Sequence, residues 1–163
     1  MKKIAKFEKV SLGQFTSDWN APNAEEVYNE IKLPHRATKG SAGYDFYAPQ
    51  SFTLAPGETI KIPTGIRAKI DEGWVLNIYP RSGLGFKFRL QLDNTVGIID
   101  SDYYNSSNEG HIMIKMTNNS LEGKSVTVAK GNAFAQGVFL EYGITTDDDA
   151  DAIRDGGFGS TTA

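Results

Sequence analysis

The sequence predicts an all-β protein with a sandwich or jelly-roll fold. Short segments rich in β-branched and aromatic residues recur along most of the chain, and glycine- or proline-containing turns separate them. The length of 163 residues suits one domain with a single sizeable core. Apolar residues make up 39% of the chain, an ordinary value for a globular protein, so we do not expect extensive disorder.

Six segments have the apolar pattern of strands. Residues 59–63 and 65–70 alternate apolar and polar side chains, whereas residues 74–79 form a fuller apolar run, as in a buried strand. The other three are residues 111–116, 125–128 and 137–142. Turn signals fall between these segments at residues 56–57, 71–73, 122–123 and 130–131, a spacing typical of a β-sandwich or jelly roll.

One short helix is predicted near the N-terminus. Asn23 can cap it, Glu26 is placed as the acid of a capping box, and Pro34 closes it. A second, short helical turn is expected around residues 84–90. Both helical segments are minor beside the strands.

The C-terminal segment differs in character from the rest. Residues 145–151 are acidic, and we interpret them as a solvated tether rather than a metal site, because they lack the spacing of a calcium loop. The glycine-rich residues 154–163 cannot build a core and are expected to be mobile until a ligand orders them. The predicted organisation is therefore a domain of residues 1–153 and a tail of residues 154–163.

Composition excludes several classes of function. The net charge of −3 argues against a basic face for nucleic acid, although local arginines can still hold a small anion. The absence of cysteine removes disulfides, zinc–thiolate sites and cysteine nucleophiles. We find neither an apolar run of membrane-spanning length nor a secretory signal, so a cytoplasmic protein without membrane contact is expected.

The candidate general base is a carboxylate. His35 and His111 are the only histidines, and neither has companions spaced for a metal site, so both are expected to be surface or hydrogen-bonded residues. Asp100 follows Gly97 in a tight turn and can reach a water molecule held against an electrophile. The alternative is that Asp100 is an ordinary turn former, and Asp45 is ambiguous in the same way.

Two further segments suggest phosphate contacts. Arg81, Ser82 and Gly83 join a strand to a helical turn and combine a guanidinium, a hydroxyl and backbone amides; a plain capped turn is the alternative. Residues 156–161 resemble a phosphate-binding loop in composition, but the Lys-Ser/Thr ending of a P-loop is missing, which disfavours an ATPase. With Arg154 before it, this tail could instead close over a nucleotide.

Five segments, in order and spacing, resemble the motifs of the homotrimeric dUTPase family. They are residues 42–46, residues 80–84, Asn94 with residues 97–103, residues 131–136 and residues 154–161. The resemblance implies a jelly-roll trimer whose three sites are each built by three subunits. It also implies hydrolysis of dUTP to dUMP and pyrophosphate, which limits uracil incorporation into DNA, with Mg²⁺ as cofactor.

The resemblance also implies a role for each site residue. Asp100 would activate the attacking water, and Tyr103 would pack under the deoxyribose. Asp45 would touch Mg²⁺ through water. The remaining residues would bind substrate: Asn94, Gly97 and Ile99 the uracil edge; Arg81, Ser82, Gly83, Gln136, Arg154, Gly159, Ser160 and Thr161 the phosphate side; and Phe158 the face of the base.

The chain departs from the family pattern in three places. Residues 104–109 lengthen the loop after Tyr103, as is common in bacteriophage members, so a phage or prophage origin is implied. Asn132 and Ala133 replace an acid and an Arg of the fourth motif, and Lys130 is a candidate substitute. In the fifth motif, Arg154 lies one residue nearer Phe158, and a common Gly is replaced by Thr162.

Two other functions are compatible with parts of the sequence. The related dCTP deaminase needs a glutamate base, for which the sequence has no counterpart, and the glycine-rich tail favours a dUTPase. A binding module would use residues 104–109 to dock a protein partner, although a tolerated surface insertion explains them more simply.

Overall fold

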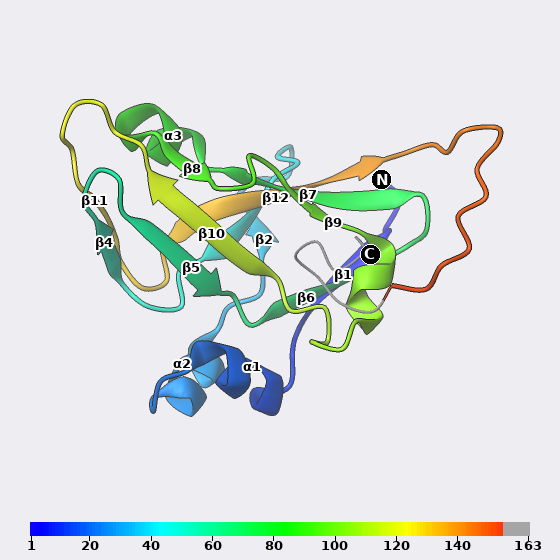
Figure 1. The fold of residues 1–163 in the computed structure, drawn as a ribbon, viewed down its shortest axis with the longest axis horizontal. Coiled ribbons are helices and arrows are strands. Elements are labelled where there is room, and N and C mark those ends of the chain that lie inside the picture. Colours follow the sequence, from blue (N-terminus) through cyan, green and yellow to red (C-terminus); the bar gives the residue numbers. More distant parts are fainter. Residues whose placement is uncertain (155–163) are drawn as a thin grey trace.

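The computed structural model describes residues 1–154 and is built mainly of short antiparallel strands (Figure 1). The N-terminal half contains β1 (Ala5–Lys9), α1 (Leu12–Trp19), α2 (Ala24–Glu30), β2 (His35–Arg36), β3 (Tyr44–Tyr47), β4 (Phe52–Leu54), β5 (Thr59–Pro63), β6 (Ile66–Ile70) and β7 (Trp74–Pro80). The C-terminal half contains α3 (Ser82–Phe88), β8 (Leu90–Leu92), β9 (Gly97–Ile99), the 3₁₀ helix η1 (Ser101–Asn105), β10 (Met113–Asn118), β11 (Val126–Val128) and β12 (Ala133–Glu141).

The strands form two facing sheets and two smaller pairs. The larger sheet has the order β2-β3-β12-β7-β9, and the smaller one has the order β5-β10-β8. The pairs are β1 with β6 and β4 with β11. Neighbours far apart in sequence, such as β7 and β12, account for most of the pairing, as in a jelly roll. The predicted all-β, jelly-roll-like fold is confirmed.

One hydrophobic core fills the space between the sheets. Alternate residues of the strands point inward, so that Leu76 and Ile78 of β7 and Ile114 and Met116 of β10 are essentially inaccessible to solvent. Phe134 of β12 is also fully buried. The core therefore supports β7 directly, and through it the edge strand β9 that pairs with it.

Two helices, rather than the single one predicted, precede the sheets. Helix α2 lies where expected, but the side chain of Asn23 does not cap it, because Asn23 Oδ1 accepts a hydrogen bond from Trp19 Nε1 at 2.9 Å. Helix α1 was missed; its cap is Ser11, whose hydroxyl accepts from Gln14 N at 3.1 Å. The two helices enclose a small second core centred on the fully buried Phe15.

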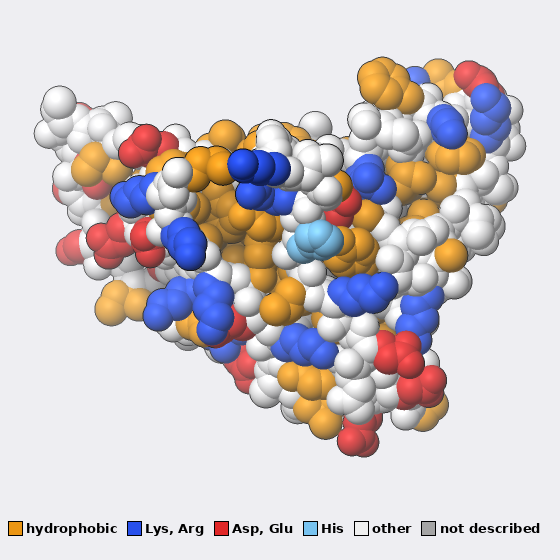
Figure 2. Space-filling view, turned by 180° about the vertical axis from the view of Figure 1, so that it is seen from behind, with side chains coloured by type: hydrophobic (Ala, Val, Ile, Leu, Met, Phe, Trp, Pro, Cys, Tyr) orange, Lys and Arg blue, Asp and Glu red, His pale blue; other side chains and the backbone are white. Residues whose placement is uncertain are grey.

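The surface carries charges of both signs. Figure 2 shows basic and acidic side chains interspersed over one face, unlike the single-sign track that follows a nucleic-acid backbone. Among residues 1–154, no helix is long and apolar enough to cross a membrane.

Candidate active site

A cavity of about 380 Å³ lies between the two sheets at strand β9. Ile78, Leu92 and Ile114 form its apolar floor. The polar residues that line it include Asn94 and Lys115. An apolar pocket with a few polar groups is the usual form of a small-molecule site. Of the predicted residues, Asn94, Gly97, Ile99, Tyr103 and Arg154 all line this one cavity.

Gly97 lies in a strand and not in the predicted turn. It pairs with Ile78 across β7 and β9, and its φ is not in the left-handed region. A Cβ added there would lie 3.1 Å from Ile78 Cβ, so the residue must be small because the two strands approach closely. The turn comes earlier, where Val96 N donates to Asn94 O at 2.7 Å. Since β9 is the edge of its sheet, one row of its backbone groups is left for a ligand.

Tyr103 is held rigidly at the side of this cavity. The residue is 6% exposed, and its hydroxyl donates to His111 O at 2.8 Å. The same oxygen accepts a hydrogen bond from Asn108 Nδ2 at 2.8 Å. Burial raises the pKa of the Tyr103 phenol, so it stays a neutral donor.

Asp100 and Asp102 share a cationic partner, Arg154. Asp100 is the cap position of η1 but makes no side-chain cap, and Arg154 Nη2 donates to its Oδ2. Arg154 Nε donates to Asp102 Oδ1 at 2.9 Å. Figure 1 shows how this arises: the chain swings outward after β12 and returns to η1. Asp100 is therefore not simply a turn former, because its carboxylate forms an ion pair with the guanidinium of Arg154.

A second cavity of about 610 Å³ lies at the start of α3. Arg81, Ser82 and Gly83 line it together with Lys87 and Asn132. A guanidinium and an ammonium beside a hydroxyl form an electropositive surface that suits phosphate oxygens.

Asp45 and Gln136 support this second cavity from two neighbouring strands. They are paired in register between β3 and β12. Asp45 Oδ1 lies 3.1 Å from Arg81 Nε, and Gln136 Nε2 donates to Pro80 O at 3.0 Å. A Cβ at Gly43 would come within 2.7 Å of Gln136 Oε1, so a larger residue there would displace the Gln136 amide. Three of the motif segments thus meet at one place.

The two cavities have no lining residue in common. One combines an apolar floor with a nearby carboxylate, and the other combines cations with a hydroxyl. Each supplies only part of what hydrolysis of a nucleoside triphosphate requires.

Comparison with known proteins matches residues 29–162 to the dUTPase family model. The chain belongs to the dUTPase family. Among curated relatives, the deoxyuridine 5'-triphosphate nucleotidohydrolase of Lactococcus lactis subsp. lactis is 44% identical over 136 residues, covering 82% of this chain and 89% of that protein. The enzyme of the same name from Tolumonas auensis is 42% identical over 143 residues, covering 83% and 90%.

Solved structures agree with the family assignment. The dUTPase of Streptococcus mutans superposes with a TM-score of 0.64 at 33% identity, covering 85% of this chain and 97% of that one. The dUTPase of phage phi11 of Staphylococcus aureus shares the fold with a TM-score of 0.65 at 20% identity, covering 97% and 99%. The predicted membership of the dUTPase family is confirmed.

The departures from the dUTPase motifs can be placed on the structure. Lys130 pairs with Glu30 and is not among the residues that line the second cavity, so its use in place of the charge missing at Asn132 and Ala133 stays a prediction. Lys87 lines that cavity instead and was missed. A predicted helix that starts at Ser82 would have identified Lys87, because Gly83 and Lys87 then lie one turn apart on the same face of the helix.

The loop of residues 104–109 is packed against the N-terminal segment. The Tyr104 hydroxyl donates to Glu8, Arg67 Nη2 donates to Tyr104 O at 2.8 Å, and Ser106 is buried. The insertion is thus part of the fold of this dUTPase, and its use by a protein partner stays a prediction.

Some predictions concern the acidic segment and the tail. Residues 145–151 are exposed, as expected for a tether. Within the part of the chain that the structure describes, no group of three or more His, Asp or Glu side chains could hold a metal ion. The predicted tail contacts of Phe158, Gly159, Ser160 and Thr161 lie outside the described residues.

Proposed function

We propose that this dUTPase hydrolyses dUTP to dUMP and pyrophosphate at a site shared between subunits of a homotrimer, in the cytoplasm. One observation carries the proposal: the motif residues of a single chain divide between two cavities with no lining residue in common. A cyclic assembly brings unlike surfaces of neighbouring subunits together. The cavity at β9 of one subunit and the cavity at α3 of another would then form one complete site.

The β9 cavity would bind the deoxyuridine. The unpaired edge of β9 offers amides and carbonyls to the Watson–Crick edge of uracil, and Asn94 offers an amide beside them. Because Gly97 is packed closely against Ile78, β9 cannot move toward β7 to enlarge the pocket. A pocket of fixed size disfavours thymine, which carries an extra methyl group. Tyr103 would pack under the deoxyribose, where a fixed ring leaves no space for a 2′-hydroxyl.

Asp100 would act as the general base. It would orient a water molecule toward the α-phosphorus and take up its proton as the new P–O bond forms and the bond to the bridging oxygen breaks. In the free chain Arg154 binds Asp100 and Asp102. The γ-phosphate of the substrate would compete for this guanidinium, and transfer of Arg154 to the phosphate would leave Asp100 free to accept a proton.

The α3 cavity would bind the triphosphate. Arg81 and Lys87 would balance the charge that develops on the leaving pyrophosphate, and the Ser82 hydroxyl would donate to a bridging oxygen. Asp45 keeps Arg81 oriented, and the tail residues after Arg154 would close over the phosphates and base.

The residues present fit a Mg²⁺ ion that arrives with its substrate. No ready-made cluster of ligands exists in residues 1–154, and a hydrated Mg²⁺ bound mainly by phosphate oxygens needs none. Asp45 would contact its hydration shell through the carboxylate oxygen that does not pair with Arg81. The bound ion would neutralise triphosphate charge and fix its geometry.

Mixing two inactive variants tests the shared site. Asp100→Asn disables the β9 side and Ser82→Ala weakens the α3 side, so each homotrimer is expected to lose most dUTP hydrolysis. If the two sides come from different subunits, trimers re-formed from an equal mixture contain intact sites and should recover roughly a quarter of parent activity. A mixture no more active than its components would contradict the shared site.

Substrate controls belong to the same experiment. The parent protein with Mg²⁺ should cleave dUTP but not dTTP, dCTP or UTP at comparable rates, with dUMP and pyrophosphate as products. Release of ammonia from dCTP would contradict the proposed reaction. Sedimentation of the mixed and parent proteins checks the trimer directly.

A further inference from the structure

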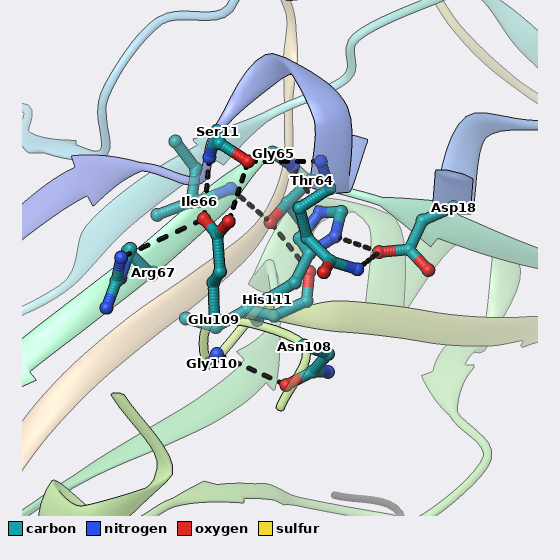
Figure 3. A network of polar contacts seen from close by, with 12 residues as sticks. Ser11, Asp18, Thr64, Gly65, Ile66, Arg67, Asn108, Glu109, Gly110 and His111 are labelled. Carbon is teal, nitrogen blue, oxygen red and sulfur yellow. Dashed lines mark hydrogen bonds and ion pairs between the residues drawn. The ribbon is translucent and has the colours of Figure 1, made fainter. Parts of the chain in front are cut away.

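Two carboxylates tie the loop after Tyr103 to both ends of helix α1 (Figure 3). At the start of α1, Glu109 accepts hydrogen bonds from the backbone N and the hydroxyl of Ser11 at 2.7 and 2.6 Å. Near its end, Asp18 Oδ2 lies 2.6 Å from His111 Nδ1. Glu109 and His111 flank Gly110, so the helix holds both sides of one tight turn. These bonds lower the pKa of Glu109, which keeps it an ionised acceptor.

The buried imidazole of His111 has one defined tautomer. His111 is fully buried, and its Nε2 accepts a hydrogen bond from Gly65 N at 2.8 Å. An acceptor at Nε2 places the proton of the neutral ring on Nδ1, from which it is donated to Asp18. Burial lowers the pKa of His111, although the Asp18 carboxylate partly offsets the effect. The ring is therefore fixed at both nitrogens in its neutral form.

The same turn holds Tyr103 at two points. The Tyr103 hydroxyl donates to the carbonyl oxygen of His111, and Asn108 donates to that hydroxyl. On the backbone side, Gly110 has a φ of 68°, and a Cβ there would lie 2.6 Å from Tyr103 O. The phenol and the main chain of Tyr103 thus both depend on the turn that α1 holds.

We propose that helix α1 is part of the sugar-selecting apparatus of this enzyme. Asp18 and Ser11 are positioning residues: they act through His111 and Glu109 to keep the Tyr103 ring at the wall of the β9 cavity. The inference rests on the proposed contact between Tyr103 and the deoxyribose. A ring anchored at its hydroxyl and its backbone cannot tilt to admit a 2′-hydroxyl, whereas a released ring can.

The test compares kcat/KM for dUTP with kcat/KM for UTP in variants of the full chain. Asp18→Ala removes the acceptor of His111 Nδ1 and should reduce the dUTP preference by about fivefold to tenfold, the effect of losing one ordinary hydrogen bond. Asp18→Asn should retain the preference, because the amide oxygen still accepts from Nδ1–H. Glu25→Gln, which removes an exposed carboxylate from α2, is the matched control and should match the parent.

Tyr103→Phe keeps the aromatic ring but removes its anchor to His111 O, so its preference should fall as much as that of Asp18→Ala. Ser11→Ala tests the other end of α1 if Asp18→Ala does not fold. A parent-like preference in folded Asp18→Ala overturns the inference even if its melting temperature falls, as does an equal loss in Asp18→Asn or Glu25→Gln. A parent-like dUTP preference in Tyr103→Ala would refute the contact between Tyr103 and the sugar, and with it the inference about α1. The proposed reaction would still stand if this variant hydrolyses dUTP normally.

Discussion

Replacing Gly97 by alanine tests the packing that shapes the β9 cavity. The new Cβ would lie 3.1 Å from Ile78 Cβ, 3.4 Å from Ile78 Cγ1 and 3.7 Å from Leu92 Cδ2. Carbon atoms prefer separations of about 3.5 to 4.0 Å, so the first contact is several tenths of an ångström too short. The nearest atom is Ile78 Cβ, whose position is fixed by the backbone of β7, so a change of rotamer at the buried Ile78 cannot lengthen this contact. The strain must therefore be relieved by moving β9, which lines the cavity, away from β7.

Overpacking of this kind costs about 1–3 kcal/mol of unfolding free energy. For a chain of this size the cost corresponds to a decrease in melting temperature of roughly 2–10 °C, measured at one fixed protein concentration. Because the displaced strand changes the shape of the proposed uracil pocket, KM for dUTP should rise together with the loss of stability.

Gly85→Ala is the matched control for Gly97→Ala. Gly85 lies within α3, and a Cβ there would have no atom within 4 Å. Alanine should be neutral or raise stability by up to about 1 kcal/mol, because it favours the helix. A Gly97→Ala protein that melts and binds dUTP like the parent would refute the packing argument, and a Gly85→Ala protein that loses equal stability would show that any added methyl is harmful.

Two further predictions concern ionisable groups. Asp100→Asn should lower kcat by about 10²–10⁴ while dUTP binding, measured by calorimetry with a non-hydrolysable analogue, changes little; near-parent turnover would dismiss Asp100 as the base. His111 is expected to make the protein sensitive to acid. Its pKa in the folded state lies below the ordinary 6.5, so the unfolded chain binds a proton first, and stability present above about pH 6.5 is lost as the pH falls. The melting temperature should decline between about pH 7 and about pH 5, and His111→Gln should weaken that decline. If the melting temperature declined equally in the parent and in His111→Gln, ionisable groups other than His111 would be responsible for the acid sensitivity.

The strands show where sequence patterns suffice. The alternation over residues 59–63 and the apolar run from residue 74 predicted β5 and β7 closely, because each strand has an inward face that the core requires to be apolar. The sequence predicts a turn at Gly97–Ile99, because three residues that include a glycine show no hydrophobic period. Pairing with β7 makes this segment a strand, and pairing is a contact between distant parts of the chain.

Helix α1 illustrates a second limit. Its Ser11 cap and Gln14 are readable as a helix start, but Gly13 and Thr16 weaken the helical propensity of the segment. Packing of Phe15 against α2, stacked on Trp19 at 5.2 Å, stabilises the helix instead. Such stabilisation comes from tertiary contacts and leaves only a faint local signal.

Local patterns and motifs with fixed spacing are enough to predict the fold class, the family and the chemical types of the candidate site residues. Which of these residues meet follows from the three-dimensional packing alone. That packing brings Asp45 to Arg81 and Arg154 to Asp100, divides the motif residues between two cavities, and buries His111 against Asp18, 93 residues away in sequence. Charge pairing and burial act between side chains close in space, and spacing along the chain does not encode that closeness.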